Sequence, residues 1–322
     1  MRAYVLRRVL QTLPLLFGIS LLTFLLLQLA PGDFLNQMAE NPAISADTIE
    51  AMRRRFGLDQ PWYTQYGMYV RNILLRFDFG ESFSRHQPVF VVLREGLANT
   101  LLLAIVSAFV TWGLAIPLGI WAAVRQHSWV DRLLSLLAFI WLSIPEILSG
   151  LLLLMFAART GWFPVGGMRS IDYDDLTTFS KFIDVAHHLA LPALVVGLIP
   201  LASRMRQMRG NLLDVLRLDY VTTARSKGLD ERVVVFKHAL RNALNPMITL
   251  FGYTLGALVS GSFIAEIIFS WPGLGRLTLD AILTQDQYLV MGSVLMASVV
   301  LIAGNLIADL LLAAVDPRIS YD

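Results

Sequence analysis

Long apolar stretches separated by short polar segments dominate this chain of 322 residues. Six stretches carry almost no charge, and they cover residues 9–30, 97–124, 133–158, 189–203, 246–265 and 288–308. A helix needs about 20 predominantly apolar residues to cross a bilayer. We therefore predict an all-α membrane protein with six transmembrane helices. The fourth stretch is short and contains Pro192 and Pro200, which membrane helices tolerate.

Composition supports the membrane class. Hydrophobic residues make up 56% of the chain and charged residues 16%, whereas a soluble domain is about 25% charged. Arg2, Arg7 and Arg8 precede the first apolar stretch, which is longer than a cleaved leader requires, so we expect an uncleaved signal-anchor. The chain has no cysteine, which excludes disulfides and thiolate metal sites.

Lysine and arginine in short flanking segments predict the orientation. One side of the predicted spans carries Arg2, Arg7, Arg8, Arg125, Arg132, Arg204, Arg206, Arg209 and Arg318. The loop after the third span is instead rich in aspartate, at Asp172, Asp174, Asp175 and Asp184. We therefore expect both termini in the cytosol. The basic pI of about 9.0 reflects this topology and does not indicate nucleic-acid binding.

The loop 31–96 is too long for a plain connection. It contains two predicted helices, 45–56 with Ser45 as its cap and 62–77. We expect a small extracytoplasmic helical subdomain here. The predicted organisation is an N-terminal transmembrane helix at 1–30, this insertion at 31–96, and a five-helix core at 97–322 that contains a cytosolic loop at 205–246.

A basic, helix-forming block at 219–246 separates the fourth and fifth predicted spans. Asp219 is expected to cap a short helix, Gly228 to end it and Asp230 to cap a second one. The second helix shows one apolar stripe, formed by Val233, Phe236, Leu240 and Ala243. The pattern predicts a helix-turn-helix bracket against the membrane surface, which suits force transmission from a soluble partner to the spans.

Catalytic motifs are absent from the sequence. It has no Gly-x4-Gly-Lys-Ser/Thr loop, so the chain is not expected to hydrolyse ATP, and it lacks HExxH and GxSxG. Adjacent residues do not share a helix face, so His187 and His188 are expected to be an interfacial pair and not a metal site. We expect no enzyme activity, no metal and no cofactor in this chain.

Ionisable groups inside the predicted spans are costly and therefore informative. Glu146 follows Pro145 near the middle of the third span, and both a pathway role and a structural pairing remain open for it. For Asp309, one turn after Asn305, we favour a structural partner over a pathway role. We assign Glu146, Ser143 and Asn305 to a candidate translocation pathway.

Several motifs resemble the first permease of the bacterial dipeptide, oligopeptide and nickel ABC importers. They are LLTFLLLQLAPGD at 21–33, FGES at 79–82, TARSKGL at 223–229, HALRNALNP at 238–246, FSWPGLGR at 269–276 and VDPRI at 315–319. The likeness covers nearly the whole chain. The general coupling pattern begins Glu-Ala-Ala, whereas Thr222 and Thr223 stand at its first two positions here, and its later Leu-Pro is Leu240-Arg241. Ala224 and Gly228 are kept.

The resemblance implies a type I ABC importer permease fold in the bacterial inner membrane. It implies a pore shared with a paralogous permease as a heterodimer, two cytosolic ATPases that hold ATP and Mg²⁺, and an extracytoplasmic substrate-binding protein. It assigns the contact with an ATPase to a coupling helix formed by Asp219, Tyr220, Thr222, Thr223, Ala224, Arg225, Lys227 and Gly228. The expected cargo is di- or oligopeptide, with nickel chelates, glutathione, and sugars or opines as alternatives.

The sequence fits two other classes of protein less well. A secondary transporter or channel is disfavoured by the long cytosolic bracket and by the lack of paired ionisable residues in the spans. A membrane-embedded enzyme is disfavoured because the chain carries no catalytic constellation. A membrane scaffold would leave transport intact when the gene is deleted.

Within the family, an apolar or aromatic residue is usual at the position of Glu146, so its carboxylate is expected to favour a cationic cargo.

Overall fold

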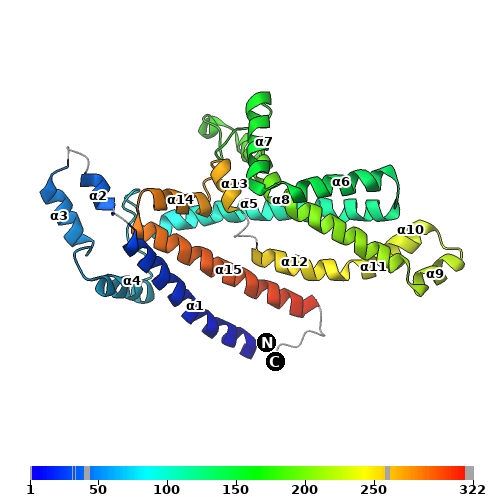
Figure 1. Ribbon diagram of the computed structural model, residues 1–322, viewed down its shortest axis with the longest axis horizontal. Helices are drawn as coiled ribbons and strands as arrows, with labels where there is room; N and C mark the ends of the chain where they lie inside the picture. The colour runs from blue at the N-terminus through cyan, green and yellow to red at the C-terminus, as the bar shows by residue number, and fades with distance from the viewer. Residues whose placement is uncertain (1, 31, 33, 40–43, 258–261, 316–322) are drawn as a thin grey trace. The chain divides into compact units, whose positions relative to one another are not determined.

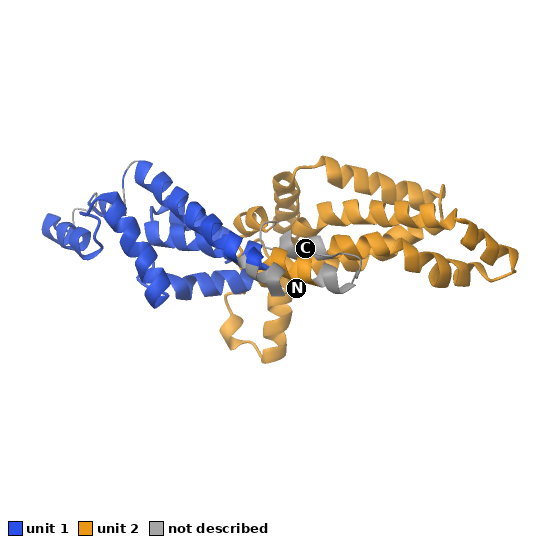
Figure 2. Ribbon diagram, turned by 90° about the horizontal axis from the view of Figure 1, so that it is seen from below, with its two compact units in different colours: residues 1–100, 272–303, 321–322 blue, residues 101–271, 304–320 orange. Residues whose placement is uncertain are grey.

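The computed structural model describes all residues except 1, 31, 33, 40–43, 258–261 and 316–322. Helices and short loops make up the described part of the chain. It contains no β-strand, and its one β-type pairing is an isolated bridge between Glu81 and Pro88. The chain forms two compact units, one from residues 1–100 and 272–303 and the other from residues 101–271 and 304–320 (Figure 2). Helices α5 and α15 contribute residues to both units.

The first unit contains seven helices or parts of helices within its described residues (Figure 1). They are α1 (Arg2–Leu29), α2 (Phe34–Ala39), α3 (Ala46–Arg55), α4 (Trp62–Arg76), the start of α5 (Val89–Val124), α14 (Leu274–Leu283) and the start of α15 (Gln287–Val315). The predicted helices at 45–56 and 62–77 are thereby confirmed. Ser45 caps α3 by accepting a hydrogen bond from the Thr48 amide at 3.3 Å.

A buried carboxylate ties the FGES turn to α15 inside the first unit. Asp286 is fully buried, and its Oδ2 accepts hydrogen bonds from the hydroxyl of Ser82 at 2.6 Å and of Ser84 at 2.9 Å. The Ser84 amide donates to the same oxygen at 3.0 Å. A buried charge is stable only when it is paired or well hydrogen-bonded. These donors explain why serine stands at 82 and 84.

The second unit contains the remaining elements. They are α6 (Trp129–Ser143), α7 (Glu146–Thr160), the 3-10 helix η1 (Tyr173–Asp175), α8 (Thr178–Leu216), α9 (Asp219–Ser226), α10 (Glu231–Val233), the π-helix η2 (Val234–Ala239), α11 (Leu240–Ala243), α12 (Asn245–Ala257), α13 (Phe263–Ile268) and the ends of α5 and α15. Helices α6 and α8 lie side by side in Figure 1. The Arg209 guanidinium joins them through two hydrogen bonds to the buried Asp131 carboxylate, at 2.6 and 2.8 Å.

Close backbone approach joins α5 to α8. A Cβ atom at Gly119 would lie 2.7 Å from the Met205 carbonyl oxygen, so only glycine fits there. Nearby, the Thr111 hydroxyl donates to the Gly197 carbonyl at 3.1 Å. Small residues and hydroxyl hydrogen bonds of this kind are typical of helix packing in membranes, where apolar burial alone does not drive association.

Four helices in the described part of the chain are long and apolar enough to cross a membrane: α1, α5, α8 and α15. The pair α6 and α7 would be a fifth span, but the two helices bend by 107°. The stretch 133–158 was expected to be one helix, and this expectation is wrong. Pro145 lacks an amide hydrogen and pushes Ile144 into an extended conformation, with ψ of 125°, so the helix stops there.

The fifth predicted stretch, 246–265, is only partly visible. Helix α12 ends at Ala257 with 13 residues, and positions 258–261 lie outside the described residues. The short fourth stretch, 189–203, belongs to the 39-residue helix α8, whose flanking polar turns extend it at both ends. The structure thus gives four spans, or five with the bent pair, in the residues that it describes.

Candidate functional site

The bracket predicted at 219–246 is present, and α9 is its first arm. The chain leaves α8 at Arg217, and Leu218 takes the extended N-cap conformation without a side-chain hydrogen bond. Asp219 is the first helical residue and not the cap, which corrects the expectation. The two-residue connection leaves the cap to Leu218. The Asp219 carboxylate still lies in the first turn, where negative charge stabilises the helix dipole.

The turn after α9 follows the prediction. Gly228 has φ of 72°, in the left-handed region that glycine adopts without strain. Its amide donates to the Arg225 carbonyl at 2.9 Å. No atom lies within 4 Å of a Cβ built at this position, so the backbone conformation and not space requires glycine. Asp230 then caps α10 by accepting from the Arg232 amide at 2.8 Å, as expected.

The second arm of the bracket, formed by α10, η2 and α11, buries a different stripe from the predicted one. Val234, Val235 and Ala239 are buried together with Ala243. Of the predicted stripe, only Ala243 is fully buried, while Phe236 is 59% exposed. Val233 is 39% exposed before the π-helix begins. From Val234 to Ala239 the i to i+5 hydrogen bonds of the π-helix change the period and rotate the following positions. The α-helical spacing used for the prediction therefore fails there.

Helix α9 has one buried and one exposed face. Val221 and Ala224 are buried in a cluster with Leu212 of α8 and Val234 of the second arm. The exposed residues of the helix and its turn include Asp219, Tyr220, Thr222, Thr223, Arg225, Lys227 and Gly228. Ala224 is thus a packing residue, whereas the other predicted coupling residues lie on the surface. Figure 1 shows α9 beside α10, beyond the ends of helices α8 and α11.

Arg225 holds the bracket together. Its guanidinium donates two hydrogen bonds to the Glu231 carboxylate, from Nε at 3.1 Å and from Nη2 at 2.7 Å, and a third to the Leu216 carbonyl at 3.3 Å. The hydrogen bond from Arg225 lowers the pKa of Glu231 from its ordinary value, and the same bond raises the pKa of Arg225. A bidentate pair fixes both side chains geometrically.

A second contact closes the two arms. The Asn242 side-chain amide donates to the Tyr220 hydroxyl at 2.8 Å, and that hydroxyl donates to the His238 carbonyl at 3.4 Å. Sequence reasoning found Tyr220 and Arg225 but missed their partners Asn242 and Glu231. The opposite charges of Arg225 and Glu231 across a glycine turn are the only sequence signal for either contact. The two arms of the bracket are therefore braced against each other, and Arg225 also ties them to the end of α8.

The candidate pathway residues occupy two places. Ser143 ends α6 and donates to the Phe139 carbonyl at 2.8 Å, and Glu146 begins α7 on the other side of the break. Oε1 of Glu146 and Oγ of Ser149 are buried without a hydrogen-bond partner in the described residues. Asn305 lies exposed on α15, and no hydrogen bond joins it to Glu146 or Ser143 in the part of the chain described. Ser143 and Glu146 thus flank the break between α6 and α7, and Ser149 lies one turn further along α7.

The two histidines make separate backbone contacts. His187 Nε2 lies 2.7 Å from the Trp162 carbonyl, and His188 Nδ1 lies 2.8 Å from the Asp184 carbonyl. Among the described residues, no three histidine or acidic side chains converge as metal ligands do. The interfacial position of the pair stays a prediction, and His188 is only 7% exposed.

Two family models cover most of the chain. Residues 115–321 match the inner membrane component of binding-protein-dependent transport systems, and residues 1–104 match the N-terminal region of the same membrane component. The first match includes the whole bracket. The chain belongs to the inner membrane components of binding-protein-dependent transport systems. This membrane component is therefore a multi-pass protein of the inner membrane.

Full-length relatives of this membrane component are named as peptide permeases. AppB of Bacillus subtilis, an oligopeptide transport system permease, is 42% identical over the whole of both chains. DppB of Pseudomonas aeruginosa, a di/tripeptide transport system permease, is 36% identical over all of this chain and 99% of its own. A structure of the MetNI methionine ABC transporter matches 69% of this chain and 97% of its own, with a TM-score of 0.48 and 21% identity.

Proposed function

We propose that this membrane component is the permease subunit of an ATP-driven importer of di- and oligopeptides. The observation that carries the proposal is the end-to-end match to permeases named for oligopeptides and for di- and tripeptides. The braced bracket supports it, because a transporter driven by a separate motor needs a rigid part that the motor can push. The chain itself supplies a path and a lever, and the ATP chemistry belongs to other subunits.

The partners follow from this role. A paralogous permease completes the pore as a heterodimer, and an extracytoplasmic binding protein delivers the peptide. Two cytosolic ATPases hold ATP and Mg²⁺, and one of them takes α9 into a surface groove. The exposed side of α9, with Tyr220, Thr222, Thr223 and Lys227, forms the contact. The buried side, with Val221 and Ala224, passes the displacement to α8 and the second arm.

The proposed topology has six spans with both termini in the cytosol. Four long apolar helices, the bent α6 and α7 pair, and the apolar α12 supply enough segments for six crossings. The arginine distribution sets the orientation. We propose the domain organisation expected from the sequence: a first span at 1–30, an extracytoplasmic insertion at 31–96 and a core at 97–322 with the loop 205–246.

The proposed pathway includes the break between α6 and α7. Oε1 of Glu146 is buried and lacks a partner in the described residues, so a group absent from this single chain is expected to meet it. A paralogous permease or a cargo is such a group. Ser143 lies across the break, and Asn305 is assigned to the same pathway. A carboxylate in this position favours a cationic cargo, such as the free amino end of a peptide.

Growth of a deletion strain tests the function. A strain without this gene should fail to grow on defined di- and oligopeptides as the sole source of a required amino acid, and the gene supplied in trans should restore growth. A strain whose partner ATPase cannot hydrolyse ATP should fail in the same way. Normal growth on peptides, together with loss of a nickel-dependent enzyme activity or of glutathione uptake, would instead indicate a nickel chelate or glutathione as the cargo. Uptake without ATPase activity would indicate a secondary transporter.

A further inference from the structure

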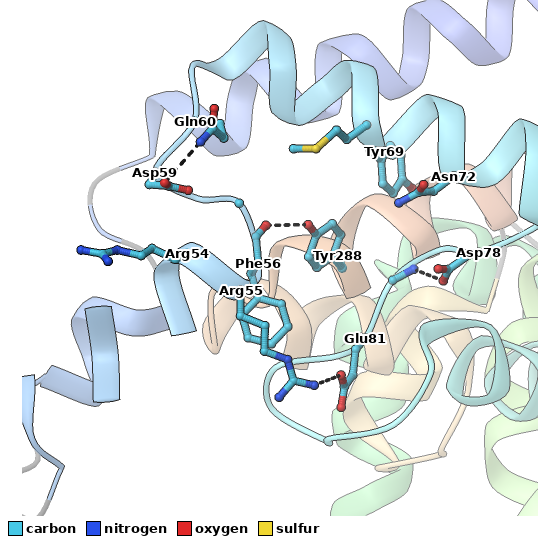
Figure 3. A pocket seen from close by; sticks show the side chains of 13 residues that line it. Arg54, Arg55, Phe56, Asp59, Gln60, Tyr69, Asn72, Asp78, Glu81 and Tyr288 are labelled. Atoms are coloured by element: carbon cyan, nitrogen blue, oxygen red, sulfur yellow. Dashed lines mark hydrogen bonds and ion pairs between the residues drawn. The ribbon is translucent and has the colours of Figure 1, made fainter. Parts of the chain in front are cut away.

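Two cavities in the described part of the chain differ in the charges that line them. The cavity in the first unit has a volume of about 540 Å³. Figure 3 shows that its wall carries both signs of charge, contributed by Arg54, Arg55, Asp59, Asp78 and Glu81. Arg55 and Glu81 lie 3.6 Å apart as an ion pair. Charges of opposite sign offset each other in this wall, so it selects neither a cation nor an anion.

The second cavity lies between α6 and α8 in the second unit, and its volume is about 480 Å³. This volume is in the range of small-molecule sites, roughly 300–1,000 Å³. Arg206 and Arg209 line it, and no described acidic residue does. The rest of the wall is formed by Ser135, Phe139, Leu142, Ser203 and Gln207. The cavity therefore offers positive charge, polar groups and apolar side chains together, and the candidate pathway residues do not line it.

Arg206 supplies the uncompensated charge of this second cavity. Its guanidinium carbon lies 4.2 Å from the centre of the Phe139 ring, a cation–π contact that holds it against α6. It forms no ion pair or hydrogen bond with any described residue. Arg209 differs, because the Asp131 carboxylate accepts two hydrogen bonds from it and neutralises it. The five N–H donors of Arg206 are therefore positioned but have no acceptor within the described chain.

Two more donors lie on the same face of α8. Ser203, Arg206 and Gln207 are three and four residues apart, so their side chains are neighbours on the helix surface. The Ser203 hydroxyl forms no hydrogen bond with a described residue, and Gln207 only accepts one, through Oε1, from Arg204 at 3.5 Å. A guanidinium, a hydroxyl and an amide without acceptors fit an anion that carries several oxygens, such as a phosphate.

The cavity lies where an apolar span gives way to a basic segment. Residues 189–203 of α8 carry no charge, and three arginines follow within six residues, at Arg204, Arg206 and Arg209. On α6, Phe139 and Leu142 are 52% and 38% exposed, so the wall beside the guanidinium is an apolar surface. In the proposed topology this boundary is on the cytosolic side. Basic pockets between spans on that side bind anionic lipid head groups.

We propose that the cavity between α6 and α8 binds an anionic phospholipid. Arg206, Ser203 and Gln207 hold the phosphate, and the start of an acyl chain lies along Phe139 and Leu142. The combination of donors and apolar side chains in one wall suits an amphipathic ligand better than a free phosphate or the carboxylate of a peptide. The lipid site goes beyond the transport role, and it rests on the proposed topology only for the leaflet that supplies the lipid.

Native mass spectrometry of the assembled, delipidated transporter tests the site by lipid titration. The probe is phosphatidylglycerol, and phosphatidylcholine with the same acyl chains is the zwitterionic comparison. Phosphatidylglycerol is expected to bind more tightly. Arg206→Gln should weaken its binding by about tenfold, the scale of a lost charge-assisted hydrogen bond, and should abolish the preference over phosphatidylcholine. Arg132→Gln is the matched control, because Arg132 is an exposed arginine of α6 that does not line the cavity.

Ser203→Ala and Arg206→Lys separate binding from a structural role. Ser203→Ala removes one donor and should weaken phosphatidylglycerol binding several-fold, whereas Arg206→Lys keeps the charge and should retain part of the binding. The Tm without added lipid should be the same in both variants and in the wild type, because neither side chain has a hydrogen bond or an ion pair to lose within the described chain.

Three results would overturn the lipid site. They are equal affinity for the two lipids, phosphatidylglycerol binding that is unchanged in Arg206→Gln, and displacement of the lipid by millimolar inorganic phosphate, which would indicate a site for a free anion. Displacement by a peptide but not by its C-terminal amide would also overturn it, because the cavity would then hold cargo. Lipid binding that persists when topology reporters place Leu216 outside would contradict the proposed orientation alone.

Discussion

The Arg225 guanidinium donates two hydrogen bonds, at 3.1 and 2.7 Å, to the Glu231 carboxylate across the Gly228 turn. Both side chains are partly exposed, at 40% and 57%, so the pair by itself adds little to stability. Its importance is geometric. Together with the Arg225 bond to the Leu216 carbonyl, it fixes α9 relative to the end of α8 and the start of α10. We therefore expect a displacement of α9 to be passed on to α8.

Reversing the charge at Arg225 should therefore uncouple the transporter. In Arg225→Glu two carboxylates face each other, the turn opens, and transport and substrate-stimulated ATPase activity should fall while the protein still inserts. The double substitution Arg225→Glu with Glu231→Arg restores opposite charges and should recover much of the activity. Failure of the double variant to recover would show that Arg225 contacts the ATPase directly and that the internal pair is incidental.

Gly228→Val should distort the same bracket by straining its backbone at the turn. A residue with a side chain pays about 1–2 kcal/mol in the left-handed region, and a β-branched residue tolerates it least. Uptake and stimulated ATPase activity should fall with insertion intact. Gly228→Asn is the matched control, because asparagine adopts this conformation more readily. Equal activity of Gly228→Val and wild type would contradict the role given to this turn.

Roles that a residue plays within its own turn could be predicted from the sequence, and contacts between distant segments could not. Ser45, Asp230 and Gly228 act locally, through their own backbone or the next turn, and all three roles were predictable. The buried stripe of the second arm was not, because a π-helix changes the period that the prediction assumed. The break at Ile144 follows a rule that proline imposes, yet apolar composition concealed it. The Tyr220 contact with Asn242 depends on how two arms meet, which no spacing along the chain encodes.

Removing one partner of the buried ion pair between α6 and α8 should destabilise the second unit. Asp131→Asn leaves Arg209 facing a neutral group, and the cost should stay below the roughly 3–5 kcal/mol of a fully buried pair, because Arg209 is 25% exposed. The Tm in detergent should fall. Ser128→Ala, which removes only the cap of α6, should cost about 1 kcal/mol. An unchanged Tm in Asp131→Asn would show that the pair contributes no net stability.

Glu146→Gln should change cargo preference. The substitution keeps the shape of the side chain and removes its charge. Uptake of basic or free-amino peptides should decrease more than uptake of acidic or N-blocked peptides, with assembly intact. Glu50→Gln, the same substitution at an exposed glutamate of α3, is the matched control and should leave cargo preference unchanged. An equal loss for all peptides together with poor assembly would assign Glu146 a structural role, and no change at all would refute both roles.

Reporter fusions test the topology on which the bracket depends. Fusions at Ser128, at Leu216 and at the C-terminus should all report the cytosol, because arginines gather on that side. A fusion at Asp174 should report the outside. An external signal at Leu216 would place α9 away from any cytosolic ATPase and would overturn the orientation and the coupling role together.

Site-directed photo-crosslinking tests the central claim most directly, namely that the exposed face of α9 contacts an ATPase subunit. The chain has no cysteine, so one introduced at Thr222 gives a single attachment point for a benzophenone maleimide. Irradiation of the assembled, active transporter should join Thr222→Cys to an ATPase subunit, and the yield should change between the ATP-bound and nucleotide-free states. Tyr63→Cys, in the insertion that we propose to be extracytoplasmic, should give no such product. An active transporter in which Thr222→Cys never crosslinks to the ATPase would contradict the account.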